Sequence, residues 1–532
     1  MEMAGDVPQS QRSMLTAMLA KPKGGYRPIG LFRCTHRVWS KVRKQAAAQV
    51  VTQNLHSSIF SMRPGQKCTD PIWRSQVTSV VSRGESNHIV EFDWDVQKCF
   101  EVVQRPILAR LGLKHGWHPS LVRLSLGSYA WCRRLMDGHG LVSRKLCARH
   151  GVVAGSGFVL HELHTYMCDE AMEVLLCQPN LKLIIHVDDV AAEATGKTPR
   201  KAAEALEEGA FHLVHAFEDR LKLMFEPDKA FLLGSSKEVV SLAAKKLRNR
   251  AGCVVPEMRR LGVDHSQNGR TKNHVWKETW KTARARRVKM NKFSSKRHSP
   301  RKIFTCGVMP SLLFAAEVVL PPLKSINQAR TWGLQYWPVV ARGLSSDIGY
   351  QIIGVKFDPA LLLCEKPLLR WAEEWYGLAR GKSGELTAKV LAGAFCFEQT
   401  QYQPKLWKPT CPQTGSPVTY ATLAAAMVGW SFKDANKLVD QNGRVLNMME
   451  GSPGMLRYFY RRAWLADSLK YRLRRATVAG TRVATQFFTR SRSACRCHWF
   501  YGTSHSENAA YQNKANATTI TRNLQHSVML LL

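Results

Sequence analysis

Two adjacent aspartates, Asp188 and Asp189, are the residues whose type and spacing most directly suggest chemistry in this chain. They lie inside the run Leu181–Thr195, where two stretches rich in β-forming residues flank them, so the pattern predicts a hairpin with both carboxylates at its turn. Two carboxylates about 4 Å apart repel each other by about 4 kcal/mol at an effective dielectric of about 20. A divalent cation relieves that repulsion, and Mg²⁺ prefers carboxylate oxygens. An Asp-Asp pair by itself is more often a surface turn, so other segments must distinguish the two interpretations.

A second set of acids lies on a segment that alternates between apolar and acidic residues, from Ile89 to Val96. Such alternation predicts a half-buried strand. One face carries Val90, Phe92, Trp94 and Val96, and the other carries Glu91, Asp93 and Asp95. The acidic face is either a metal-ligating surface or a solvated sheet face balanced by nearby lysines.

The elements around these acids predict how they are positioned. The segment 151–177 begins with glycines and becomes helical, and Thr198 followed by Pro199 predicts the start of a helix that runs to about Leu221. A strand or loop carrying Lys229 follows, whereas residues 1–19 are expected to be partly helical. The order strand, helix, hairpin, helix, strand is that of a split β-α-β sheet. This order would bring the end of the Asp95 strand beside the Asp188-Asp189 turn.

Charge points to a polyanionic partner. The net charge is +37, with 77 Lys and Arg against 40 Asp and Glu. Nucleic acid is the first candidate for the partner, and an anionic membrane surface is the second. Near the N-terminus, Lys21, Lys23 and Arg27 surround the turn signal Gly24-Gly25. This segment is either an exposed basic hairpin or a cationic clamp, in which the planar guanidinium of Arg27 suits a triphosphate.

The largest concentration of positive charge lies between His265 and Phe304, which holds thirteen Lys or Arg residues and one acid, Glu278. Trp276 and Trp280 are four residues apart and are expected to share one face of a helix. A basic helix with aromatic residues on one side suits a phosphate backbone. The run 296–302 also has the composition of a nuclear signal, although this pattern is weak.

Cysteine usage and hydropathy exclude other classes. The 14 cysteines include no Cys-x-x-Cys pair, which argues against a zinc ribbon and a secreted disulfide scaffold and favours reduced thiols in the cytoplasm or nucleus. No signal peptide is visible. The most apolar run, 311–323, is interrupted by Glu317 and by Pro321-Pro322, so we expect no transmembrane helix and no membrane partner.

Taken together, the segments from about Leu19 to Trp337 resemble a reverse transcriptase, most closely those of LINE-type (non-LTR) retrotransposons. The run 21–29 resembles the fingers hairpin, which implies that Lys21, Lys23 and Arg27 meet the incoming triphosphate. Asp95 with Phe100 five residues later resembles the first catalytic motif. The resemblance makes Asp95 and the carbonyl of Val96 metal ligands, and it places Phe100 under the sugar, where it excludes a ribose 2′ hydroxyl.

The remaining motifs follow in the family's order. Gly155-Ser156 resembles the template-and-nucleotide loop, and the run from His186 to Asp189 resembles the catalytic box. Lys229 matches the lysine near the leaving pyrophosphate. Arg260 and Gly262 lie in a segment similar to the primer grip, which implies contact with nucleic acid. The basic helix behind it resembles the thumb, with Arg284, Arg286, Arg287 and Lys289 on the duplex.

The resemblance implies an α+β fold of the right-hand polymerase type, with fingers, a split β-α-β palm and a helical thumb, followed by a mostly helical C-terminal region. The expected boundaries are 1–85 for fingers with a portion missing at the N-terminus, 86–250 for the palm, 251–345 for primer grip and thumb, 346–475 for a helical region of unknown role, and 476–532 for a disordered tail. Two Mg²⁺ ions, with Mn²⁺ as a substitute, would be held by Asp95, Val96, Asp188 and Asp189. The partners would be an RNA template, a DNA primer and deoxynucleoside triphosphates.

Three departures from the family pattern stand near the expected site. His186 replaces the usual Tyr or Phe, Ala154 the usual Gln, and Glu101 the common Asp, although none of these removes a metal ligand. No endonuclease or RNase H segment is visible. The alternative is therefore a retroelement-derived protein that binds nucleic acid without catalysis. An RNA-templated RNA polymerase is disfavoured by Phe100.

Overall fold

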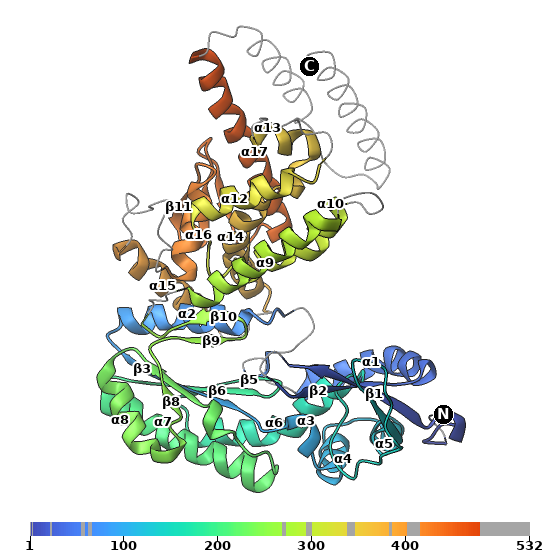
Figure 1. Ribbon diagram of the computed structural model, residues 1–532. Helices are drawn as coiled ribbons and strands as arrows, with labels where there is room; N and C mark the ends of the chain where they lie inside the picture. Colours follow the sequence, from blue (N-terminus) through green and yellow to red (C-terminus); the bar gives the residue numbers. More distant parts are fainter. Residues whose placement is uncertain are drawn as a thin grey trace.

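The computed structural model describes residues 2, 4–21, 24–54, 59–61, 66–268, 273–293, 300–337, 346–381, 386–401 and 415–478. A sheet of five strands, in the order β5-β6-β3-β7-β8, lies in the lower half of the view in Figure 1. Its strands are β3 (His88–Asp95), β5 (Leu181–His186), β6 (Asp189–Gly196), β7 (Phe231–Gly234) and β8 (Cys253–Val254). The mixed α and β architecture agrees with the expected fold class.

The predicted order of strand, helix, hairpin, helix and strand is confirmed. Helix α6 (Val159–Cys177) precedes the β5–β6 hairpin, and α7 (Pro199–Val214) follows it before β7. The N-cap of α7 is Thr198, whose hydroxyl accepts a hydrogen bond from the Lys201 amide at 3.2 Å. A π-helical turn, His215–Arg220, continues this helix almost to Leu221, where the sequence predicted its end.

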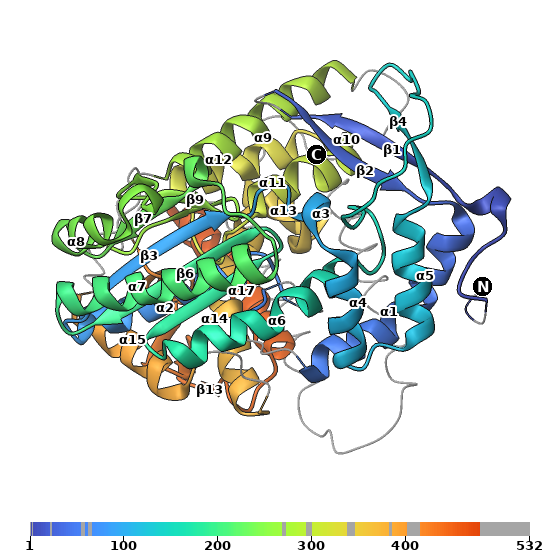
Figure 2. The same ribbon diagram turned by 90° about the horizontal axis from the view of Figure 1, so that it is seen from below.

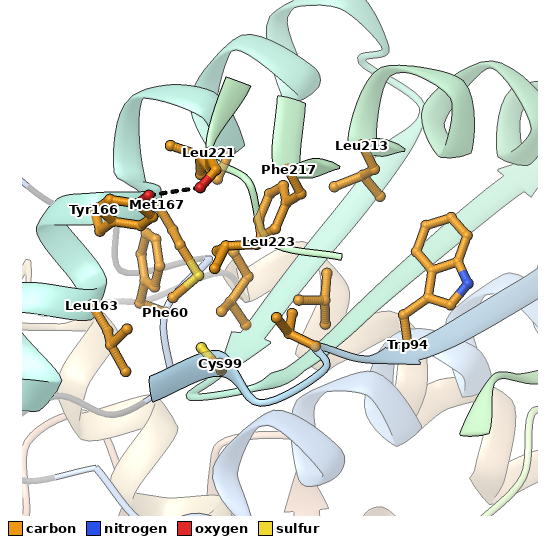
Figure 3. Close-up of a cluster of buried hydrophobic side chains, with 14 of the residues drawn as sticks. Phe60, Trp94, Cys99, Leu163, Tyr166, Met167, Leu213, Phe217, Leu221 and Leu223 are labelled. Atoms are coloured by element: carbon orange, nitrogen blue, oxygen red, sulfur yellow. Dashed lines mark hydrogen bonds between the residues drawn. The ribbon is translucent and has the colours of Figure 1, made fainter. Parts of the chain in front are cut away.

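The two faces of the sheet have different partners, as the alternation in β3 predicted. On the apolar face, Trp94 stacks on Phe225 with ring centroids 4.6 Å apart. The Tyr166 hydroxyl donates to the Leu221 carbonyl at 2.6 Å on the same face, as Figure 3 shows. Helices α6, α7 and α8 (Lys237–Leu247) cover this face. The acidic face lies below helix α2 (Asp70–Gly84) and the hairpin of β9 (Met258–Arg260) and β10 (Val263–His265) (Figure 1).

The N-terminal region forms a second sheet in the order β2-β1-β4, with β1 (Ser13–Ala20), β2 (Tyr26–Leu31) and β4 (Cys132–Met136). Residues 1–19, which the sequence predicted to be partly helical, have only three described residues in a helical conformation, and their main element is a strand. A short 3₁₀ turn at Gln9–Gln11 precedes β1, which pairs with β2 and, in parallel, with β4. The partner β4 lies far away in sequence, so local propensity could not indicate it. Figure 2 shows the helices that accompany this sheet: α1 (Cys34–Asn54), α3 (Cys99–Val102), α4 (Arg105–Lys114) and α5 (Pro119–Tyr129).

The basic region forms a helical group around α9 (His274–Phe293), and Trp276 and Trp280 lie on one face of α9 as predicted, with ring centroids 5.4 Å apart. Trp280 in turn contacts Trp332 at 5.5 Å, so the tryptophans pack α9 against α12 (Leu323–Leu334). The members of the group are α9 (His274–Phe293), α10 (Pro300–Ile303), the π-helical turn Phe304–Val308, α11 (Met309–Leu313) and α12 (Leu323–Leu334).

The C-terminal region is mostly helical, as expected, but it also contains a small sheet that the sequence did not predict. Its strands are only three or four residues long, too short to show alternation. The elements are α13 (Ser346–Ile353), α14 (Pro359–Leu378), α15 (Ala388–Gln401), α16 (Pro417–Ala426), β11 (Ser431–Asp434), β12 (Lys437–Val439), β13 (Val445–Asn447) and α17 (Pro453–Val478). The expected disordered tail lies outside the described residues, apart from the end of α17.

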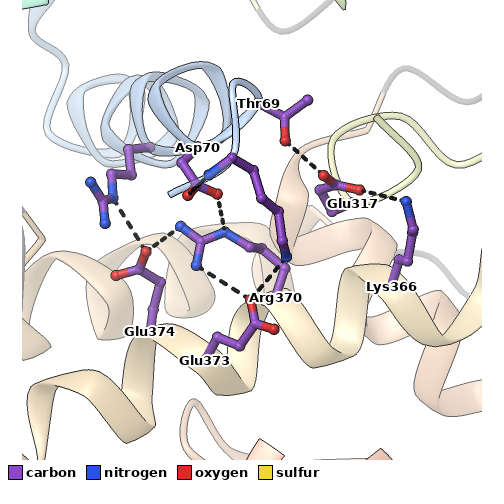
Figure 4. Close-up of polar contacts among 9 residues, drawn as sticks. Thr69, Asp70, Glu317, Lys366, Arg370, Glu373 and Glu374 are labelled. Atoms are coloured by element: carbon purple, nitrogen blue, oxygen red, sulfur yellow. Dashed lines mark hydrogen bonds and ion pairs between the residues drawn. The ribbon is translucent and has the colours of Figure 1, made fainter. Parts of the chain in front are cut away.

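Helix α2 joins this C-terminal region to the central sheet. Trp73 of α2 and Trp371 of α14 belong to one buried core. A network of charged groups surrounds that contact (Figure 4): Arg370 pairs with Asp70 at 3.1 Å, and Arg74 pairs with Glu374 at 3.2 Å. In the same network, Thr69 donates to Glu317 at 2.7 Å. Among the described residues, no helix is long and apolar enough to cross a membrane.

Candidate active site

Strand pairing brings the three predicted aspartates to one edge of the acidic face. Asp95, the last residue of β3, lies opposite Asp189, the first residue of β6. Asp188 lies in the β5–β6 turn, where Val187 has a φ of +64°, and the Asp188 carbonyl accepts a hydrogen bond from the Val96 amide at 2.9 Å. The backbone therefore fixes all three aspartates relative to one another, as the split β-α-β order predicted.

Two carboxylates of this edge, those of Asp188 and Asp189, are poorly neutralised. Burial, together with the neighbouring charges of Asp188 and Asp95, raises the pKa of Asp189 to about 6. Burial also raises the pKa of Asp188, with the charge of Asp95 acting in the same direction. Both shifts mean that the ionised forms lack sufficient positive charge nearby.

Two cations reach this edge. The Lys229 ammonium pairs with Asp95 Oδ2 at 2.5 Å, and this hydrogen bond raises the pKa of Lys229. Arg27 is exposed on β2, and its charge acts to lower the pKa of Asp188. Lys21 is exposed at the start of the β1–β2 turn, where its amide donates to the Gly25 carbonyl at 3.0 Å. Lys23, the third residue of the predicted clamp, lies outside the described residues.

Phe100 and the loop before α6 lie next to each other. Phe100 is half-buried in α3, and its carbonyl accepts a hydrogen bond from the Val152 amide at 2.7 Å. Gly155 has a φ of +109°, and a Cβ at this position would lie 2.5 Å from the Gly30 carbonyl oxygen. The loop therefore packs directly on β2, and only glycine fits at this point.

Ser156 differs from the prediction that it contacts a nucleotide. Its side chain is almost buried, and its hydroxyl accepts hydrogen bonds from the Tyr129 hydroxyl at 2.9 Å and the Phe158 amide at 3.3 Å. Tyr129 also bonds Glu162 at 2.5 Å, and burial raises the pKa of Glu162 to about 7. These contacts give Ser156 an internal role, namely anchoring the loop to α5 and α6.

Arg260 also differs from its predicted role. The sequence assigned it to nucleic acid, but its side chain is only 4% exposed and forms an ion pair with Glu91 of β3. The strands that carry it, β9 and β10, meet at Leu261 and Gly262, which both have positive φ, as in a type I′ turn. The guanidinium therefore holds the hairpin onto the sheet from inside, while Gly262 lies at the turn.

The four basic residues assigned to the duplex divide into two pairs on α9. Arg284, Arg286 and Lys289 are exposed, and Arg287 is half-buried. Arg286 nevertheless donates to the Ser311 hydroxyl at 2.5 Å and to the Gly307 carbonyl at 3.2 Å. Arg287 donates to Gln335 at 2.6 Å and lies over the Trp332 ring at 5.2 Å. Arg286 and Arg287 therefore hold the helical group together, and Arg284 and Lys289 face outward.

The aspartates match a hard divalent cation in chemistry and in backbone position, since carboxylate oxygens are the preferred ligands of Mg²⁺. Among the described residues, however, no three or more His, Cys, Asp or Glu side chains converge on one possible metal position. Asp95 Oδ2 is directed to Lys229 instead. A cation at this edge would therefore compete with the Lys229–Asp95 ion pair.

His186, which departs from the family pattern, is held beside this edge. Its Nδ1 lies 2.7 Å from the Ser61 hydroxyl, and burial lowers the pKa of His186. The ring is therefore held neutral at physiological pH. Ser61 was not singled out from the sequence, because nothing in its neighbourhood signals a contact with a residue 125 positions away.

The largest feature that the sequence did not reveal is a buried polar cluster farther along the same face. Glu91 and Glu193 lie opposite each other on β3 and β6. His265 Nε2 contacts Glu91 at 2.7 Å, the Ser75 hydroxyl donates to Glu193 at 2.7 Å, and Gln267 donates to both carboxylates. Burial alone would raise the pKa of Glu91, but His265 and Arg260 outweigh it and lower that pKa. We call this set of residues, with Arg260, the buried glutamate cluster.

Asp93 lies between this cluster and the aspartate edge. Burial, the largest cause, raises its pKa to about 7, and the charges of Glu91, Asp189 and Asp95 act in the same direction. Within the described part of the chain, its Oδ1 atom has no hydrogen-bond partner. The acidic face of β3 predicted from alternation is thus real, but its three acids have three different environments.

No protein-family model and no curated protein matches the sequence. Solved telomerase structures show weak similarity to the fold. Apo telomerase from Candida tropicalis is 11% identical, with 74% of this chain and 68% of the telomerase chain covered and a TM-score of 0.38. Telomerase from Candida albicans in complex with a TWJ fragment of telomeric RNA is 9% identical, with 75% and 64% covered and a TM-score of 0.37.

A Candida tropicalis telomerase truncated from its C-terminal domain matches over 49% of this chain and 55% of its own, at 11% identity and a TM-score of 0.35. The chain therefore spans 55% to 68% of the length of these telomerase chains. Because the likeness is weak, the function is inferred from the residues of the site.

Proposed function

We propose that this chain adds deoxynucleotides to a primer 3′ hydroxyl under the direction of an RNA template, as a reverse transcriptase of a LINE-type retroelement. One observation carries the proposal. The pairing of β3 with β6 sets Asp95 opposite Asp189 and next to Asp188, at an edge where the pKa values of Asp188 and Asp189 are both raised. The finer assignment to LINE-type elements comes from the motif resemblance at 21–29, 95–100 and 186–189.

The three aspartates would hold two divalent cations, with the Val96 carbonyl as a further ligand. Such ions lower the pKa of an attacking hydroxyl and stabilise the charge on a triphosphate. The aspartates themselves position the reacting groups, because the strand register fixes their spacing. Lys229, released from Asp95, would neutralise charge on the departing pyrophosphate. Arg27 would donate its planar fork to the triphosphate.

Contacts with the sugar and the duplex come from other elements. Phe100, fixed through its backbone to the loop at Val152, would fill the space of a ribose 2′ hydroxyl and so favour deoxynucleotides. The exposed side of α9, with Arg284 and Lys289, would contact phosphates of the primer–template duplex. The net charge of +37 supports a polyanionic partner for the whole chain.

A second function has an observation in its favour. The aspartate side chains do not converge on one possible metal position among the described residues, and Lys229 already neutralises part of Asp95. A protein that binds nucleic acid through its basic surface without catalysis would have no need of convergent carboxylates. This alternative predicts binding without synthesis.

Primer extension distinguishes the two functions. The full chain is mixed with poly(rA)/oligo(dT) and dTTP, with either Mg²⁺ or excess EDTA, and binding of the same substrate is measured in parallel by fluorescence anisotropy. We expect extension with Mg²⁺ only, and we expect Asp188→Asn to abolish extension while binding stays nearly unchanged. Equal binding of both proteins shows that the variant is folded.

Two results would overturn the proposal. Binding without any extension at every Mg²⁺ or Mn²⁺ concentration favours the non-catalytic alternative. Extension that survives in Asp188→Asn would mean that the reaction does not depend on this aspartate edge. A preference for NTPs over dNTPs would instead remove the assignment of Phe100 as the sugar gate.

A further inference from the structure

Two cysteines face each other across a hairpin of the N-terminal sheet. Arg133 of β4 and Leu146 exchange two backbone hydrogen bonds, each 2.8 Å long. A further bridge joins Met136 to Val142, so the chain between 133 and 146 is a hairpin. Cys132 and Cys147 are the next residues outward, and they form a non-hydrogen-bonded antiparallel pair. In such pairs the Cα atoms are about 4.5 Å apart and the side chains are closest.

The side chains of this pair already lie in contact. The two Sγ atoms are 2.9 Å apart, and both thiols are free. Cys147 is exposed and Cys132 is half-exposed, so small reagents can reach them. The Cα separation of a non-hydrogen-bonded pair falls within the roughly 4.4–6.8 Å that disulfides span. The backbone therefore needs little or no movement to accommodate a bond between these sulfurs.

We propose that Cys132 and Cys147 form a reversible disulfide and that this pair is a redox modification site of the protein. The oxidant is a small-molecule disulfide of the glutathione type. One cysteine thiolate attacks a sulfur of this disulfide, forms a mixed disulfide and releases one thiol. The second cysteine thiolate then attacks the protein-side sulfur and releases the second thiol. The protein loses two electrons and two protons, and the small disulfide is reduced to two thiols.

The surroundings explain why the internal bond should prevail over the mixed disulfide. Arg105 donates to the carbonyls of Ala148 at 3.1 Å, His150 at 3.0 Å and Gly151 at 2.8 Å, which fixes the chain directly after Cys147. On the other side, β4 is paired with β1 from Cys132 onward. Both sulfurs are therefore held in place, and the second exchange step is intramolecular.

The bond would also have a structural consequence. Cys132 and Cys147 are 15 positions apart, so a disulfide closes a loop that the unfolded chain could otherwise open. The segment after Cys147 continues into the loop that holds Gly155 against β2. Oxidation should therefore stabilise the N-terminal sheet and this loop together, and the oxidised protein should unfold at a higher temperature than the reduced one.

The test uses the full chain and needs no nucleotidyl transfer. The reduced protein is incubated with oxidised glutathione, the remaining thiols are alkylated, and the digest is analysed by mass spectrometry without reduction. We expect a peptide linked through Cys132 and Cys147 with no glutathione on either residue. The exposed Cys177 and Cys253 serve as internal references and should carry glutathione. The same treatment in urea should reduce the yield of the specific link, because the fold no longer holds the sulfurs together.

Matched variants separate the pair from a general effect of oxidation. Cys132→Ser should leave Cys147 with a stable glutathione adduct, whereas Cys177→Ser should form the 132–147 link as the wild type does. The melting temperature should rise on oxidation in the wild type and Cys177→Ser but not in Cys132→Ser. Wild-type protein with glutathione on both cysteines, or with both still free while Cys177 and Cys253 are modified, would overturn the proposal.

Discussion

The acidic face of the central sheet has two ends that carry the same kind of residue in opposite electrostatic states. At one end, Glu91 and Glu193 lie opposite each other, and the buried glutamate cluster supplies Arg260, His265 and Gln267 as partners. At the other end of the same strands, Asp95 lies opposite Asp189 and one ammonium, that of Lys229, pairs with Asp95. The pKa of Glu91 is lowered, whereas that of Asp189 is raised to about 6.

This difference teaches where function resides on the face. Both ends remove carboxylates from water, which is unfavourable unless each charge finds partners. At the glutamate end the protein supplies the partners itself, so that end stabilises the attachment of the β9–β10 hairpin. At the aspartate end the protein leaves the negative charge of the carboxylates only partly neutralised, and an external cation would neutralise the remainder. Missing counter-charge, rather than acidity or burial, distinguishes the two ends.

The largest expected effect is on the free energy of unfolding and follows from removing a carboxylate at the glutamate end. Glu91→Ala removes the partner of Arg260 and His265 and leaves a buried guanidinium without its carboxylate. Breaking a buried ion pair in this way costs about 3–5 kcal/mol. We expect urea unfolding to show a loss of this size in the free energy of unfolding. Glu85→Ala, at an exposed position near the end of α2, should change it by less than about 0.5 kcal/mol.

The pH dependence of the free energy of unfolding tests the same contrast between the glutamate end and the aspartate end. Because the pKa of folded Glu91 lies below the ordinary glutamate value of 4.5, the stabilisation that its charge provides is complete above that value and disappears as the pH falls toward the folded pKa. The difference in stability between wild type and Glu91→Ala should therefore shrink below about pH 4. A difference that grows in acid would contradict the assignment of Glu91 as a stabilising ionised partner.

The next effect is on catalysis and compares two acids of one strand. Asp95→Asn should reduce primer extension by at least about 100-fold, since a metal ligand contributes several kcal/mol to the transition state. Asp93→Asn should keep measurable extension, because Asp93 is half-buried behind the edge and its pKa is raised to about 7. The measurement is the initial rate with saturating Mg²⁺. If Asp93→Asn were the inactive variant, the metal ligands would lie one strand repeat away from the proposed edge.

The sequence was sufficient for the aspartate edge and insufficient for the glutamate end, and the reason is physical. The edge depends on two local patterns, the alternation in 89–96 and a hairpin, and on the order of elements that defines a split β-α-β sheet and so predicts how strand and hairpin meet. The glutamate end depends on Glu91 meeting His265, 174 positions later, which no local pattern encodes. For the same reason the sequence assigned Arg260 to contact with nucleic acid and Ser156 to contact with the nucleotide. Their types and positions fit a family motif, but only the fold reveals that both side chains point inward.

A smaller effect is expected on α9, where two of the four basic residues, Arg286 and Arg287, have hydrogen-bond acceptors within the protein. Arg284→Ala with Lys289→Ala should reduce the slope of log K against log salt for duplex DNA by up to about 1.8, because each phosphate contact contributes about 0.9. The melting temperature should not change. Arg286→Ala with Arg287→Ala should instead lower the melting temperature, because it removes the bonds to Ser311 and Gln335.

Fluorescence anisotropy over a series of salt concentrations and a thermal melt of each double variant provide both readouts. If the Arg284/Lys289 double variant changed only stability and the Arg286/Arg287 double variant changed only the salt slope, the roles of the two pairs would have to be exchanged. If neither pair changed the salt slope, α9 would not lie on the duplex, and the positive charge of this region would serve solubility alone.

The smallest expected effect concerns stability at the uncompensated end. Because the pKa of folded Asp189 is raised from 3.8 to about 6, the native state binds more protons than the unfolded state between these values. Stability therefore falls as the pH rises through this window, and above it the ionised carboxylate destabilises the fold. In EDTA at pH 7, Asp189→Asn should raise the free energy of unfolding by on the order of 1 kcal/mol, less than the full shift because water screens the site.

Addition of Mg²⁺ should reverse the order of stability, so that wild type becomes more stable than Asp189→Asn. A cation that binds the folded state stabilises it in proportion to the logarithm of its concentration over Kd. Wild type should therefore gain more stability from Mg²⁺ than Asp189→Asn, which lacks one of the carboxylates. Asp228→Asn, at an exposed carboxylate next to Lys229 in sequence, should match wild type in EDTA and in Mg²⁺. If Asp189→Asn lowered stability in EDTA, the aspartate end would be compensated after all, and the contrast between the two ends of the sheet would fail.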